Sequence, residues 1–283
     1  MDTAEIVLVT EIAPVVEIVT TAPSPAFYVA MALYIAASAF YLSSLAPVPA
    51  WVRRAARWAI LVAFLAHGVD IGWRGVEHVH PATSVREALG FLSWLVIGAY
   101  LILGRREGLS ILGAFVAPVT LVVLAAARLS PSGEAMSGLS TLGRIHIASA
   151  TVGVAIFSLA TVVSMLYLLQ ERNLKRKRFD GVLFKSSAAL ETLDKLASRL
   201  VAIGFPIFTI SMMLGGIWVA QLKSGFGRVE YPISFVTWLT FGGLVLARST
   251  RGFSGRRAAL ATIVGFMAAA FVMAIYFLRR SIA

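Results

Sequence analysis

The stretch RIHIASATVGVAIFSLATVVSMLYLL, residues 144–169, decides the fold class of this chain. Arg144 and His146 stand at its start, and the rest is apolar or small and uncharged. A helix of about 20 such residues crosses the hydrocarbon core of a bilayer. Comparable stretches occur at 27–45, 58–73, 88–103, 110–127, 200–220, 232–247 and 258–278. The sequence therefore predicts an all-α, polytopic membrane helical bundle with about eight transmembrane helices.

The composition agrees with a membrane domain. The chain of 283 residues is 59% hydrophobic and 14% charged, whereas a soluble domain has about a quarter of its residues charged. No long polar stretch offers a separate soluble domain. We expect an outer N-terminal segment at residues 1–26, which carries too many acidic groups to cross, and one transmembrane domain at 27–283.

The distribution of Lys and Arg predicts the orientation. Most of the 25 basic residues fall in the loops 46–57, 104–109, 170–199 and 248–257. Cytoplasmic loops of membrane proteins carry this excess, so we expect these loops inside and both termini outside, in a multi-pass protein of a bacterial inner (plasma) membrane. The same rule accounts for the net charge of +11, and we expect a lipid bilayer and no nucleic acid as partner.

The longest of these loops, the basic inner loop 171–199, has two interpretations. Leu190, Leu193, Leu196 and Leu200 follow helical spacing and predict an amphipathic helix that leads into the sixth span. It could lie at the inner membrane surface, or it could dock a partner.

The sequence lacks the residues that several classes of chemistry require. The chain has no cysteine, which excludes disulfides, thiolate metal sites and the C-x-x-C-H heme attachment motif. It also has no G-x-S-x-G, H-E-x-x-H, Walker or dinucleotide motif. We therefore predict no catalytic residue and no enzyme activity of its own.

All four histidines fall on the predicted outer side. His67 lies in the outer half of the second span with Asp70 one turn later, His78 and His80 follow in the next loop, and His146 opens the fifth span. Each has an ordinary alternative as a packed, solvated or interfacial residue. As a set they could reach one outer pocket and serve a metal, a heme or a proton relay.

Heme suits this set of ligands better than a bare metal ion. Zinc and copper sites gather three or four donors, while heme needs one or two axial ligands and an apolar wall. Trp218, Phe226 and Tyr231 could supply such a wall, although aromatic residues also anchor helices at the interface. Three arginines on the predicted outer side could pair with heme propionates or with lipid phosphates: Arg74, Arg86 and Arg144.

Two stretches carry a resemblance to a known family. Residues 80–94 read HPATSVREALGFLSW, and residues 190–206 read LETLDKLASRLVAIGFP. They resemble the span entry and the L-x-x-L-D-x-L-x-x-R-x-x-x-x-G-F-P run of the cytochrome c assembly family of the CcsA/ResC type. The eight spans are similar to its short HemX-like and YpjD-like members. His146 matches the outer histidine that begins a span ahead of the family's basic loop.

The chain departs from the heme-handling members at three places. Their Trp-rich outer loop, W-G-x-Y-W-x-W-D, reads SGFGRVEYP here at residues 224–232. Ala247 stands where a histidine usually ends the next span, and the final outer histidine has no counterpart. These departures fit the HemX-like branch of the family.

The resemblance implies an integral membrane protein that supports c-type cytochrome biogenesis by binding or presenting heme b on the outer side. The favoured axial ligand of the iron is His146, with His67 or His80 as the second. Phe226, Trp218 and Tyr231 become the ring contacts. Implied partners are heme itself and another assembly protein or an apocytochrome.

Two other functions stay open. The alternative is a HemX-like, non-catalytic regulator or scaffold of heme biosynthesis, which would dock a partner through the basic inner loop. A small-molecule transporter is disfavoured because, apart from Asp70 and His67, the sequence places few charged groups deep in the spans.

Overall fold

Long helices form nearly all of the part that the computed structural model describes, which is residues 24–77, 79, 81, 84–129, 140–177, 179, 181–221, 228 and 230–282. They are α1 Pro25–Ser43, α2 Ala50–Val76, α3 Val85–Leu103, the 3-10 helix η1 Ser110–Leu112, α4 Gly113–Leu129, α5 Thr141–Lys175, α6 Val182–Ser186, α7 Leu190–Gln221, α8 Glu230–Arg251 and α9 Gly255–Ile282. Eight of these segments are long and apolar enough to cross a membrane, and no described residue lies in a strand. The predicted all-α bundle is confirmed.

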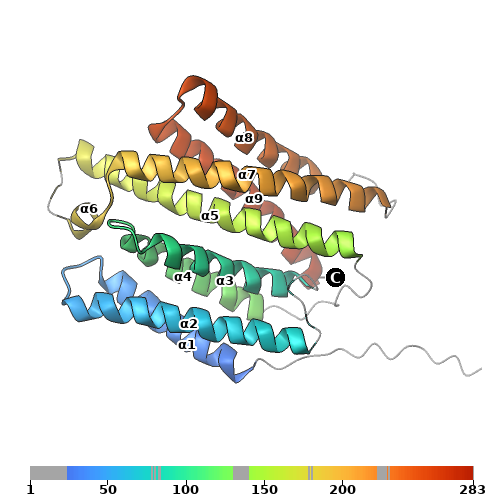
Figure 1. Ribbon diagram of the computed structural model, residues 1–283, viewed down its shortest axis with the longest axis horizontal. Helices are drawn as coiled ribbons and strands as arrows, with labels where there is room; N and C mark the ends of the chain where they lie inside the picture. Colours follow the sequence, from blue (N-terminus) through green and yellow to red (C-terminus); the bar gives the residue numbers. More distant parts are fainter. Residues whose placement is uncertain are drawn as a thin grey trace, which may run out of the picture.

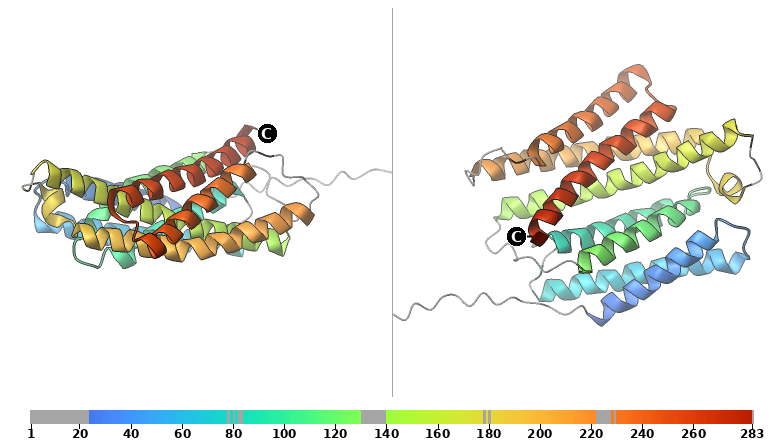
Figure 2. Two further views of the ribbon diagram at one scale, coloured as in Figure 1. Left: turned by 90° about the horizontal axis from the view of Figure 1, so that it is seen from above. Right: turned by 180° about the vertical axis from the view of Figure 1, so that it is seen from behind.

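The helices pack as a row of antiparallel pairs (Figure 1). The pairs are α1 with α2, α3 with α4, α5 with α7, and α8 with α9, and α5 also packs against α3 and α9. Seen from the other directions, the row forms a flat, elongated molecule (Figure 2). Because α3 and α4 lie between α2 and α5, residues on α2 and α5 can share a membrane depth and still lie apart.

Two apolar clusters hold the row together. The larger one runs from Tyr34 on α1 to Leu193 on α7. The smaller one surrounds Phe157 on α5, whose ring stacks on Phe241 of α8 at 3.7 Å between centroids. Packing of this kind is the main force between helices in lipid, where burial from water no longer drives association.

Most helices extend beyond the spans that the sequence predicts, and two of them begin well before those spans. α2 begins at Ala50 instead of 58, because its exposed arginines Arg53, Arg54 and Arg57 can keep their charges in water while the chain is already helical. α7 begins at Leu190 and runs through Pro206, so the predicted amphipathic helix and the sixth span are one element. The buried side chains of Leu193 and Leu196 face the apolar core.

One end of the bundle collects all the candidate site residues that the structure describes. At this end α1, α3, α5 and α8 begin and α2, α4, α7 and α9 finish; we call it the histidine end (Figure 1, right). Three of the four starts carry a serine cap, in which Ser24, Ser84 and Ser140 accept a backbone N–H three residues later. Such caps satisfy helix ends and fix where each helix begins.

Candidate functional site

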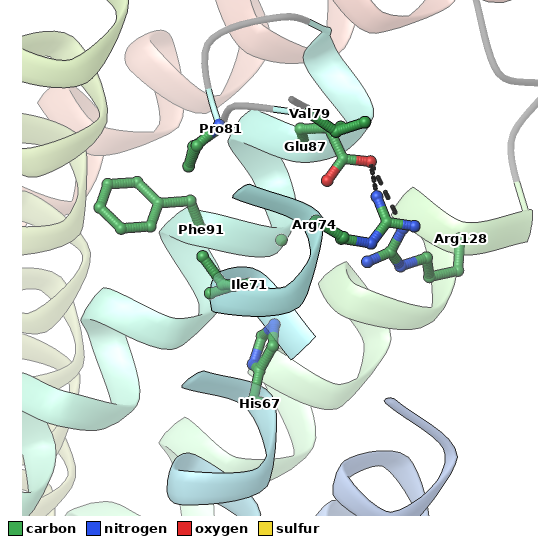
Figure 3. A pocket seen from close by; sticks show the side chains of 9 residues that line it. His67, Ile71, Arg74, Val79, Pro81, Glu87, Phe91 and Arg128 are labelled. Carbon is green, nitrogen blue, oxygen red and sulfur yellow. Dashed lines mark hydrogen bonds and ion pairs between the residues drawn. The ribbon is translucent and has the colours of Figure 1, made fainter. Parts of the chain in front are cut away.

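Four buried or largely buried charges form a closed ring at the histidine end. Asp70 and Arg74 come from α2, Glu87 from α3 and Arg128 from α4. Arg128 Nη2 lies 3.0 Å from Asp70 Oδ2, and its Nη1 lies 3.4 Å from Glu87 Oε1. Arg74 pairs with the same Glu87 oxygen (Figure 3), and its Nε lies 3.7 Å from Asp70 Oδ2. Two positive and two negative charges alternate, so the ring as a whole is neutral.

Helix α1 joins this ring through its first residues. The Ser24 hydroxyl donates to Asp70 Oδ1 at 2.6 Å, and the guanidinium of Arg128 lies 4.7 Å from the ring centre of Phe27. A buried charge in a membrane helix is costly unless it is paired, and here each charge has at least two partners. The ring therefore ties α1, α2, α3 and α4 to one another.

His67 lies beside this ring, one turn before Asp70 on α2. Its side chain is fully buried, and its Nδ1 lies 3.4 Å from the hydroxyl oxygen of Tyr34. Its Nε2 has no hydrogen-bond partner among the described residues and points toward a hollow also lined by Arg74, Arg128 and Phe91 (Figure 3). The cavity volume of the hollow is about 10 Å³. That is roughly the room that one water molecule needs, so this hollow is far too small for a porphyrin.

His146 lies in different surroundings, where α5 packs against α7. Its Nδ1 is 2.8 Å from the carbonyl oxygen of Ser211 and 3.2 Å from the Ser211 hydroxyl oxygen. That hydroxyl in turn donates to the backbone oxygen of His146 at 3.1 Å. A carbonyl oxygen can only accept, so Nδ1 carries the proton.

The tautomer leaves a lone pair on His146 Nε2. Among the described residues, every hydrogen bond to the His146 ring is made at Nδ1. A histidine that binds a metal through one nitrogen usually donates the other N–H to a carbonyl or carboxylate, and His146 shows this arrangement. Trp218 stands next to it, with 6.0 Å between ring centres. The residues present therefore fit one axial position of a heme iron and an aromatic neighbour.

The other predicted site residues divide into three groups. Tyr231 lies at the start of α8, half-buried, at the same end of the bundle as His146. His67 lies beside the charged ring, and no contact of the described residues joins it to His146. His78, His80 and Phe226 lie outside the described residues, so their part in a site stays a prediction.

Sequence reasoning missed most of the ring. The sequence predicts that Arg74 pairs with heme propionates or lipid phosphates, yet it is already bonded to Glu87 and Asp70. Glu87 and Arg128 do not stand out in the sequence, because their partners come from other helices. One signal was available in the sequence: Asp70 and Arg74 are four residues apart on a helix, which is the spacing of a same-face ion pair.

Comparisons with known proteins agree with each other. A family model for "Cytochrome C assembly protein" matches residues 82–283. The cytochrome c biogenesis protein CcsA of Guillardia theta is 24% identical over 231 residues, covering 73% of this chain and 77% of that protein. Protein HemX of Bacillus subtilis is 28% identical over 232 residues, covering 80% and 81%.

A solved structure shares the fold. The cytochrome c heme lyase CcmF superposes with a TM-score of 0.63 at 15% sequence identity, over 90% of this chain. The chain spans about half of that structure, 49% of its length. At this identity the likeness establishes the arrangement of helices and nothing about shared chemistry.

Proposed function

This chain belongs to the cytochrome c assembly protein family, and on that premise we propose that it binds heme through His146 at the histidine end of the bundle. The protein is a multi-pass membrane protein of the family that serves cytochrome c maturation. The bound heme would be the cofactor that c-type cytochromes carry.

One observation carries this proposal more than any other. The Nδ1–H of His146 is held by the Ser211 carbonyl, which leaves Nε2 as the free donor of an electron pair beside Trp218. Heme needs only one or two such ligands. The second axial position has no candidate among the described residues near His146, and His80 stays our candidate from the sequence.

The role that fits is binding and presentation. His146 would hold the iron, and Trp218 and Tyr231, with Phe226 from the adjoining loop, would contact the ring. The covalent bond between heme and an apocytochrome would form on a partner. That partner would be another assembly protein, together with the apocytochrome. The basic loops at the opposite end support an orientation in which the histidine end faces the outside of a bacterial inner membrane.

An absorption spectrum tests the proposal directly. The full chain, purified in detergent and titrated with hemin, should develop a Soret band, and His146→Ala should lose it or weaken hemin binding at least about tenfold. Equal spectra and equal affinities for the two proteins would refute heme binding through His146.

A HemX-like regulator or scaffold is the second candidate. It is favoured by the match to HemX, which extends over about four fifths of both chains. Arg176 and Lys177, exposed directly after α5, belong to the basic segment that would dock a partner. This role predicts that neutralising Arg176, Lys177 and Arg178 changes cellular heme or cytochrome c levels, while His146→Ala leaves them unchanged.

A further inference from the structure

One face of α7 contacts the His146 ring at two points. Ser211 and Gly215 are one turn apart on that helix, and Trp218 follows three residues later. Ser211 holds Nδ1 of the imidazole. At Gly215 the imidazole lies against the helix backbone, because no side chain stands between them.

The fit at Gly215 is close. A Cβ atom added there would lie 2.7 Å from Cε1 of His146, 2.9 Å from Nδ1 and 3.3 Å from Nε2. Atoms in van der Waals contact stay about 3.5–4.0 Å apart, so any other residue would push the ring away. The ring cannot simply rotate aside, since turning it would also break its hydrogen bond to the Ser211 carbonyl.

We propose that Gly215 and the Ser211 carbonyl are positioning elements for heme: together they fix the ring plane and the tautomer of His146, so that Nε2 presents its lone pair in one direction. The inference rests on the proposed function and adds to it the residues that prepare the ligand. Groups that orient a metal-ligating histidine typically change metal affinity by about 10- to 100-fold when they are lost.

The neighbouring glycine provides a matched control. Gly216 is next in sequence and on the same helix, and a Cβ added there meets nothing within 4 Å. Gly215→Ala and Gly216→Ala therefore make the same chemical change and give α7 the same gain in helix propensity. They differ in whether the new methyl group meets the imidazole.

The experiment titrates hemin into five full-length proteins in detergent: the natural chain, G215A, G216A, H146A and the double variant H146A/G215A. We expect G215A to raise the dissociation constant at least about tenfold and to shift the Soret maximum and the midpoint potential of bound heme. G216A should stay within about twofold of the natural chain. H146A and H146A/G215A should agree, because Gly215 acts only through the imidazole.

The outcomes separate the two proposals. If H146A binds hemin like the natural chain, heme binding through His146 fails. If H146A loses binding while G215A and G216A behave alike, only the positioning role fails. Should G215A not fold, removal of the imidazole in H146A/G215A must restore folding; a double variant that is also unfolded would overturn the inference.

Discussion

Arg128 on α4 donates a hydrogen bond to Asp70 on α2 across 3.0 Å, although 58 residues separate them in the chain. The Asp70 side chain is fully buried, and Arg128 is nearly so. Each also contacts a second member of the ring, Arg74 or Glu87. The contact therefore fixes how the first four helices are placed at the histidine end.

Loss of the Asp70 charge should destabilise this half of the bundle. Asp70→Asn leaves Arg74 and Arg128 with one carboxylate between them, so the ring becomes positive in a buried site. Breaking a buried ion pair from one side costs about 3–5 kcal/mol. Thermal unfolding in detergent should show a clear drop in midpoint. Lys195→Ala, which opens the exposed pair with Glu191, is the control and should barely move it. Equal shifts for the two variants would contradict a stabilising ring.

The members of the ring should be energetically coupled. In a double-mutant cycle with Asp70→Asn and Arg128→Gln, the double variant should be less destabilised than the sum of the single ones, because removing both partners leaves the ring neutral again. Residues in one ion-pair network couple by about 0.5–3 kcal/mol. The free energy of unfolding of the four proteins measures this term, and strict additivity would show that the two side chains act independently.

Much of the fold, and less of the site, could be read from the sequence. Apolar length predicts the eight spans, and loop charge together with span number predicts that His67 and His146 lie at one end. The position of each helix within the membrane plane could not be predicted, because a hydrophobic pattern does not encode which helices are neighbours. In the structure, α3 and α4 separate α2 from α5. The same limit hides Glu87 and Arg128, whose partners belong to other helices.

Heme binding should be insensitive to His67. Its imidazole faces the charged ring and the Tyr34 hydroxyl, and the hollow at its Nε2 is too small for a porphyrin. His67→Ala should therefore keep the hemin dissociation constant within about twofold of the natural chain while lowering thermal stability, since a buried hydroxyl left without a partner costs about 1–3 kcal/mol. Parallel hemin titration and thermal unfolding measure both effects. A loss of the Soret band in His67→Ala would place His67 in the heme site after all.

Two loop glycines with positive φ should differ in what an alanine costs. Gly108 has φ +73° and Gly252 has φ +60°, a region where L residues pay about 1–2 kcal/mol. A Cβ at Gly108 would also lie 2.5 Å from the backbone nitrogen of Ala188, which donates to the Gly108 carbonyl, whereas Gly252 faces open space. Gly108→Ala should thus lower the unfolding midpoint well beyond Gly252→Ala. Similar midpoints would mean that the segment before α7 shifts to accommodate the added methyl group at little energetic cost.

The orientation can be tested because the chain has no cysteine, so each single substitution introduces one thiol. Lys177 follows the end of α5 and Arg228 precedes the start of α8, and both are exposed. The end of α5 and the start of α8 lie at opposite ends of the bundle (Figure 1). The excess of basic residues around Lys177 predicts that this end lies in the cytoplasm. A membrane-impermeant maleimide applied to intact cells should label Arg228→Cys at once and Lys177→Cys only after the membrane is permeabilised. The opposite pattern would place His146 on the cytoplasmic side, and heme presentation to apocytochromes outside the membrane would then have no route.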